Sequence, residues 1–218
     1  SGNFEWKLNV PASGNLYEDF VEFDVVDMWK VNATLSATNT IITGDILQMQ
    51  SGVTANAVNH IYSVYQTSDT LRNLRKITYE SRILKNIPNN NTHIWFFGLG
   101  ATAIATENDY PYYPIVFGNV SSTTEGDYDC VYYNWNTLDY VGSGTASLTE
   151  DVYHTYKIIV EDAALPTAKY YIDGSLIFTH TLNAVYRDQK YRPYMFLVNA
   201  SGEISNEIKI SWIKITEG

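Results

Sequence analysis

The chain has 218 residues, a formal net charge of −10 and a hydrophobic fraction of 45%. This length is enough for one large β domain with its own core, and the hydrophobic fraction excludes an intrinsically disordered chain. Proteins that bind nucleic acid or anionic membrane surfaces normally present a basic face, and this acidic composition shows none. The single cysteine, Cys130, excludes an intrachain disulfide, so the fold depends on packing.

Alternation of apolar and polar residues is the main pattern along the chain. Three segments show it most clearly: 77–83, 156–160 and 208–212. Period-2 alternation is typical of a strand with one covered face, so we expect the apolar members of each segment, Trp212 included, to share the core face. Only residues 71–75 favour a helix, and at most one short turn of it.

Turn signals separate the expected strands. Asp173-Gly174 lies between two apolar runs, 170–172 and 176–178, and predicts a two-residue hairpin. Further clusters of Gly, Pro, Asn and Asp divide the chain into about twelve short strands, at the spacing of an antiparallel sandwich. We find no internal repeat and no linker. The sequence therefore predicts one domain covering residues 1–218, with residues 1–2 as a processing or cloning scar.

Several features favour an exported protein. The longest apolar stretch, 94–105, is too short to span a bilayer and is interrupted by glycines. Four N-glycosylation sequons occur, at Asn32, Asn90, Asn119 and Asn199. We therefore expect an extracellular, cell-surface or virion-surface location, with glycans attached at these four positions.

Structural motifs follow one another in a distinctive order: Trp29, Gly44 to Met49, Glu80-Ser-Arg82 with Gly98, Tyr171-Ile-Asp-Gly174, and Ile210-Ser-Trp212-Ile213. This order resembles that of concanavalin A-like jelly-roll domains, the superfamily of lectins, glucanases and laminin-G-like modules. The resemblance implies an all-β fold, a two-sheet antiparallel β-sandwich. In one respect the chain departs from it. Ser211 stands where these domains often carry Asp, near a structural calcium in many relatives.

Glucanases with this fold carry the pattern E-x-D-x-(x)-E on a central strand, where alternation with a bulge points the carboxylates into the cleft. The segment 22–27 resembles this pattern, and Glu22 and Asp27 are the weak candidates for catalytic carboxylates. However, Asp27 is shorter than the usual Glu, and the segment lies near the N-terminus. Residues 101–109, which follow Gly98 where the family places its catalytic strand, contain no such motif. The sequence therefore favours binding over catalysis.

Aromatic rings and amides gather in two later stretches, which supply the candidate carbohydrate-binding residues: Tyr110, Tyr112, Tyr113, Tyr133, Asn134 and Trp135. The first three lie in a loop in which Pro111 and Pro114 bracket Tyr112 and Tyr113, and the others follow an acidic turn. An aromatic ring covers the apolar face of a pyranose, while amides bind its hydroxyl groups. Core packing of Trp135 is an equal alternative.

The acidic turn itself is a candidate calcium site. Glu125, Asp127 and Asp129 offer the oxygen ligands that calcium prefers, and a solvated acidic turn is the alternative. The four histidines do not have the spacing of metal ligands. His154, at the start of an expected strand, is predicted to pack.

Three functions follow from these observations. The first is a non-catalytic, extracellular, lectin-like module that binds glycans or polysaccharide. The second is a structural or adhesive surface protein of a cell envelope, filament or virion, which self-associates or binds envelope or virion partners. The third is a polysaccharide hydrolase or lyase.

Overall fold

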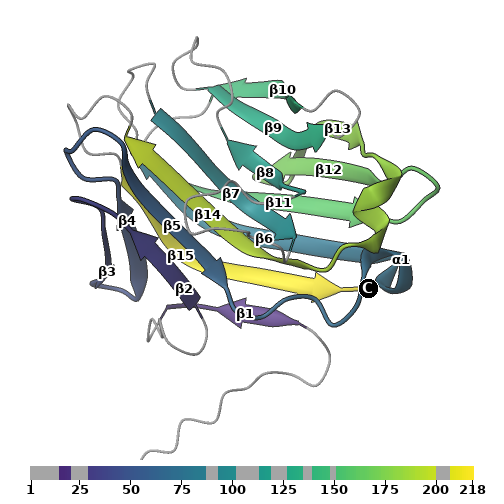
Figure 1. Ribbon diagram of the computed structural model, residues 1–218, viewed down its shortest axis with the longest axis horizontal. Coiled ribbons are helices and arrows are strands. Elements are labelled where there is room, and N and C mark those ends of the chain that lie inside the picture. The colour runs from purple at the N-terminus through teal and green to yellow at the C-terminus, as the bar shows by residue number, and fades with distance from the viewer. Residues whose placement is uncertain are drawn as a thin grey trace, which may run out of the picture.

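The computed structural model describes residues 15–20, 29–86, 93–101, 113–118, 127–134, 139–147, 151–199 and 207–218 (Figure 1). Within these ranges the chain forms fifteen strands, one short α-helix and one 3-10 turn. All strand pairs are antiparallel, and they make two sheets. Of the helices in this part of the chain, none is long and apolar enough to cross a bilayer.

One sheet has eight strands, and β1 (Leu16–Glu18) pairs with its strand β15. The other seven strands are ordered β13 (Ser175–Thr181), β12 (Thr167–Ile172), β11 (Tyr153–Glu161), β6 (Lys76–Asn86), β15 (Glu207–Glu217), β4 (Ile46–Gln50) and β3 (Thr38–Ile42). The second sheet has the order β10 (Asp139–Ser147), β9 (Asp127–Asn134), β8 (Ile115–Gly118), β7 (His93–Ala101), β14 (Tyr191–Asn199), β5 (Ala57–Ser63) and β2 (Trp29–Ala33).

The two sheets pack face to face, because buried side chains from both form one core cluster. The alternation seen in the sequence decides which side chains enter it. In β6, Ile77, Tyr79 and Ile83 are buried, and in β11 every second residue from Tyr156 to Val160 is buried. Each large apolar side chain buried in this way stabilises the fold by about 1.5–3 kcal/mol. The predicted two-sheet antiparallel sandwich is confirmed.

The closing strand β15 differs from the predicted alternation. It is bulged between Ile210 and Trp212, where its register against β6 shifts by one residue. A bulge adds one residue to a strand and so exchanges the faces of the residues that follow. Ile213 and Ile215 are therefore buried, whereas Trp212 is only half-buried. The prediction that Trp212 shares the core face was wrong.

The predicted hairpin is present between β12 and β13. Asp173 has φ 49° and Gly174 has φ 82°, the two positive values that a type I′ turn requires. The Asp173 carboxylate accepts a hydrogen bond of 2.9 Å from the Thr155 backbone N–H and lies 2.6 Å from Nδ1 of His154. The turn is thus held against the start of β11.

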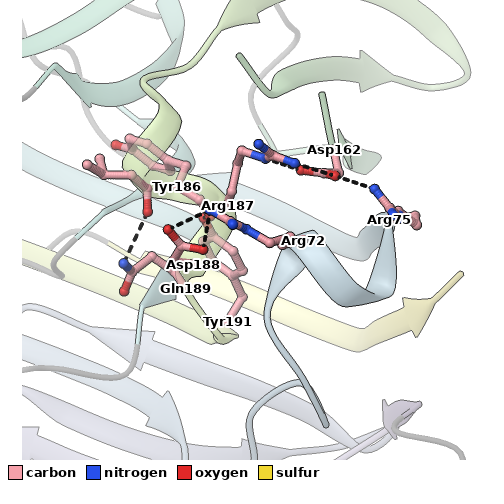
Figure 2. Close-up of polar contacts among 9 residues, drawn as sticks. Arg72, Arg75, Asp162, Tyr186, Arg187, Asp188, Gln189 and Tyr191 are labelled. Carbon is pink, nitrogen blue, oxygen red and sulfur yellow. Dashed lines mark hydrogen bonds and ion pairs between the residues drawn. The ribbon is translucent and has the colours of Figure 1, made fainter. Parts of the chain in front are cut away.

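The short helix α1 (Leu71–Leu74) and the 3-10 turn η1 (Ala184–Asp188) contact each other beside the end of β11. Asp162, the residue after β11, lies between Arg187 of η1 and Arg75, which ends α1 (Figure 2). Its carboxylate is 1% exposed. This corner holds together three segments that are far apart in the sequence.

Candidate functional site

Most residues that the sequence marked as sites have no described side chain. The positions outside the described residues are Glu22, Asp27, Asn90, Tyr110, Tyr112, Asn119, Glu125 and Trp135. A second group is described by its backbone alone: Asn32 in β2, and Asp127, Asp129, Tyr133 and Asn134 in β9. The catalytic, calcium-binding, sugar-binding and glycosylation roles given to these residues remain predictions.

Two of the predicted site residues are described in full. Tyr113 is half-buried, and its ring packs edge-on against the buried Tyr186 with the ring centroids 5.4 Å apart. Asn199 is fully buried, and its side-chain amide donates a hydrogen bond of 2.7 Å to the carbonyl of Gly52. A glycan would be attached to that same nitrogen. The predicted glycosylation at Asn199 therefore does not fit the folded chain.

A second cluster of buried side chains lies on the face of the seven-stranded sheet that points away from the core, which we call the outer face. Its buried members come from β7, β8 and β14, and they are Phe96, Val116, Tyr194 and Phe196. Their neighbours in sequence, such as Phe97 and Met195, belong to the core. Because successive side chains of a strand point to opposite faces, both faces of these strands are covered by side chains.

The strand β5 adds two rings to this cluster. Figure 1 shows β5, β14 and β7 side by side, and the register pairs Tyr62 with Tyr194 and His60 with Phe196. The His60 ring centroid lies 5.0 Å from that of Tyr62 and 4.8 Å from that of Tyr194. Aromatic rings at such separations attract one another beyond their burial. His60 is fully buried, but Tyr62 keeps part of its surface exposed.

The exposed side of the cluster is cationic. The Arg192 guanidinium lies 5.5 Å from the centre of the Tyr62 ring and donates a hydrogen bond of 3.1 Å from Nη1 to the Ser63 carbonyl. Burial lowers the pKa of Arg192, but an arginine stays charged at neutral pH. Lys30 of β2 is exposed and lies opposite Tyr62 in the register. Tyr62 is therefore flanked by two cationic residues.

The centre of the outer face is filled by aromatic and apolar groups. A Cβ atom added at Gly118 would lie 2.1 Å from Cδ1 of Phe96, so the Phe96 ring covers this glycine. The next strand along the chain, β8, pairs with β7, and neither β7 nor β8 contains Asp or Glu. Within the described part of the chain, no three His, Cys, Asp or Glu side chains form a group that could hold a metal ion.

Tyr62, Arg192 and Tyr194 were not among the site residues that the sequence predicted. The sequence signal for these residues was their spacing, because each set occupies every second position of one strand. His60 and Tyr62 are spaced in this way in β5, and Arg192, Tyr194 and Phe196 in β14. Alternation shows that the members of each set share a face. It does not show that the two strands, which lie over a hundred residues apart in the sequence, are neighbours.

No protein-family model matches the sequence, and no curated protein matches it either. Several solved structures have a similar fold. The Bacillus licheniformis beta-glucanase is 16% identical, with a TM-score of 0.65 and coverage of 95% of this chain and 100% of that one. The endo-1,3-beta-glucanase of Streptomyces sioyaensis is 10% identical, with a TM-score of 0.65 and coverage of 95% and 99%. The carbohydrate recognition domain of Emp46p is 10% identical, with a TM-score of 0.60 and coverage of 92% and 94%. The chain thus has the concanavalin A-like jelly-roll fold that its motifs predicted.

Proposed function

We propose that this chain is a non-catalytic carbohydrate-binding module that acts outside the cytoplasm, at a cell surface, at a virion surface or in the extracellular medium. The observation that carries the proposal is the aromatic outer face, with the partly exposed Tyr62 at its edge. A tyrosine ring held rigidly by its neighbours can stack on a pyranose at little entropic cost. Tyr62 is held in this way by His60 and by the guanidinium of Arg192.

The structural neighbours support a carbohydrate ligand. Of the three similar structures named above, two are glucanases and one is a carbohydrate recognition domain. Fold alone permits many functions, so the weight of the proposal rests on the rings and cations of the outer face.

A binding role is favoured over hydrolysis by the composition of the central strands. Glycosidases normally need two carboxyl groups flanking the scissile bond. In β7 and β8 the positions of the outer face hold Phe96, Val116 and Gly118, with the Phe96 ring over the glycine. The carboxylates that the sequence suggested for hydrolysis, Glu22 and Asp27, lie outside the described residues.

The test is binding of the purified chain to a panel of neutral and acidic polysaccharides, measured by calorimetry. We expect Tyr62→Ala to weaken binding about tenfold or more, as loss of a central aromatic contact does. Tyr17→Ala is the matched control, because Tyr17 is 60% exposed on β1, in the other sheet. Loss of binding in Trp135→Ala but not in Tyr62→Ala would move the site to the stretch after β9. No binding across the panel would overturn the proposal.

Release of reducing ends or of unsaturated sugars is measured in the same samples. If the wild-type chain releases such products and Glu22→Gln or Asp27→Asn does not, the function is that of a polysaccharide hydrolase or lyase and not that of a binding module. The proposed location is tested by detecting the native protein in surface and medium fractions of its source. Recovery in the cytoplasmic fraction alone would contradict it.

A structural or adhesive surface protein is the second candidate, favoured by one edge of the eight-stranded sheet. There β3 pairs only with β4 among the described strands. The backbone groups of an edge strand can pair with a strand of another molecule. Sedimentation velocity over a range of concentrations tests this candidate. Filaments or concentration-dependent oligomers, together with failure to bind glycans, would favour it over the binding module.

A further inference from the structure

Arg192 differs from most other arginines of this acidic chain. Arg72, Arg75 and Arg187 each form an ion pair with an aspartate. Arg82 and Arg192 instead lie over tyrosine rings, at 5.4 Å and 5.5 Å from the ring centres. Arg82 is exposed on the eight-stranded sheet, whereas Arg192 is half-buried on the outer face of the other sheet.

The Arg192 guanidinium is incompletely compensated. Its Nη1 donates to the Ser63 carbonyl at 3.1 Å, and its Nη2 lies 3.5 Å from Oε1 of Gln66. Its Nε is buried with no hydrogen-bond partner, and no carboxylate of the described residues pairs with the group. A partly desolvated charge with spare donors is costly unless an anion binds to it. Carboxylates and sulfates match the planar donors of a guanidinium.

Building on the proposed function, we propose that the module binds an acidic glycan, whose carboxylate or sulfate group contacts Arg192 while a sugar ring lies against Tyr62. The two elements of the site are already adjacent, since the guanidinium packs over the tyrosine ring. Lys30, exposed and opposite Tyr62 on the neighbouring strand, adds a second positive charge on the same side. The site is thus cationic in a chain whose formal net charge is −10.

The experiment compares the full chain with two matched variants, Arg192→Gln and Arg82→Gln. Each variant removes one guanidinium that lies over a tyrosine ring, but the two are on different sheets. Binding is measured against polygalacturonate, which carries carboxylates, dextran sulfate, which carries sulfates, and laminarin, which is neutral. The two acidic ligands separate the two sources of negative charge.

We expect Arg192→Gln to weaken binding of at least one acidic glycan about tenfold or more, because a charge-assisted hydrogen bond is lost. Arg82→Gln should leave the affinity within about twofold, as expected for an exposed charge. Arg192→Lys keeps the charge but loses the planar donors, so its affinity should be intermediate. Wild-type binding should also fall as salt rises, since ions screen exposed charges.

Each of the following outcomes would overturn the inference. Equal weakening by Arg192→Gln and Arg82→Gln would show a general charge effect. Binding of laminarin alone would leave the carbohydrate-binding function intact but remove the acidic ligand. Failure to bind any of the glycans would overturn the proposed function itself. If Arg192→Gln does not fold, as judged by circular dichroism, the salt series on the wild-type chain decides, and salt-independent binding of the acidic glycans overturns the inference.

Discussion

Arg187 donates two hydrogen bonds to the buried carboxylate of Asp162, from Nε at 2.6 Å and from Nη2 at 3.1 Å (Figure 2). Arg75 adds a third from Nη1 at 2.9 Å, and its backbone carbonyl accepts a hydrogen bond from the Asp162 N–H at 2.8 Å. A buried carboxylate is tolerated when donors surround it in this way. Asp162 therefore joins the end of β11 to both α1 and η1.

Replacing Asp162 by Asn should destabilise the chain by about 2 kcal/mol, because two arginines lose a charged, hydrogen-bonded partner. Both arginines keep some exposure to water, so the loss should not exceed this by much. Urea unfolding measures the effect. The control is Asp188→Asn, since Asp188 pairs with Arg72 on the surface and is 57% exposed. That variant should change stability by less than about 1 kcal/mol. Equal effects would contradict the role given to Asp162.

Acid should weaken the same corner. The hydrogen bonds from Arg187 hold the pKa of Asp162 below its ordinary value, although burial opposes them. A carboxylate with a lowered pKa contributes stability above its unfolded pKa of about 3.9, and this contribution is lost as the pH falls through the lower, folded value. Urea midpoints should therefore decrease below about pH 4 in the wild type. The decrease should be smaller in Asp162→Asn, and identical pH profiles would count against this account.

The packing of the outer face predicts a steric effect at Gly118. An alanine there would place Cβ 2.1 Å from the Phe96 ring and 2.6 Å from the Trp95 carbonyl oxygen. Overpacking of this kind costs about 1–3 kcal/mol. Thermal unfolding should show the loss, and Phe96→Leu should cost less in the Gly118→Ala background than alone, because the two sites are in contact. Strictly additive effects would show that the ring does not cover the glycine.

The predicted calcium site at Glu125, Asp127 and Asp129 can be tested by metal removal. If these oxygens hold calcium in the folded chain only, the melting temperature should rise with added calcium and fall with chelator, since a ligand that binds only the native state stabilises it. The double variant Asp127→Asn, Asp129→Asn should abolish the response. A melting temperature that does not depend on calcium in the wild type would leave the segment as a solvated acidic turn.

The sequence alone determined the features that depend on a few adjacent residues. The period-2 alternation in β6 and β11 placed Tyr79 and Ile158 on the core face, and Asp173-Gly174 predicted the hairpin that the structure contains. Such patterns are local, because a pleated strand must separate apolar from polar side chains and a tight turn needs positive φ values. The order of these signals also resembled that of concanavalin A-like domains, and this resemblance implied the jelly-roll sandwich.

Only the tertiary structure decided which distant strands pair and in which register. The bulge before Trp212 changed the face of that residue, and the pairing of β5 with β14 brought Tyr62 beside Arg192 and Tyr194. These contacts join residues over a hundred positions apart. Their register depends on how whole sheets bury their faces together, and no short segment of the chain contains that information.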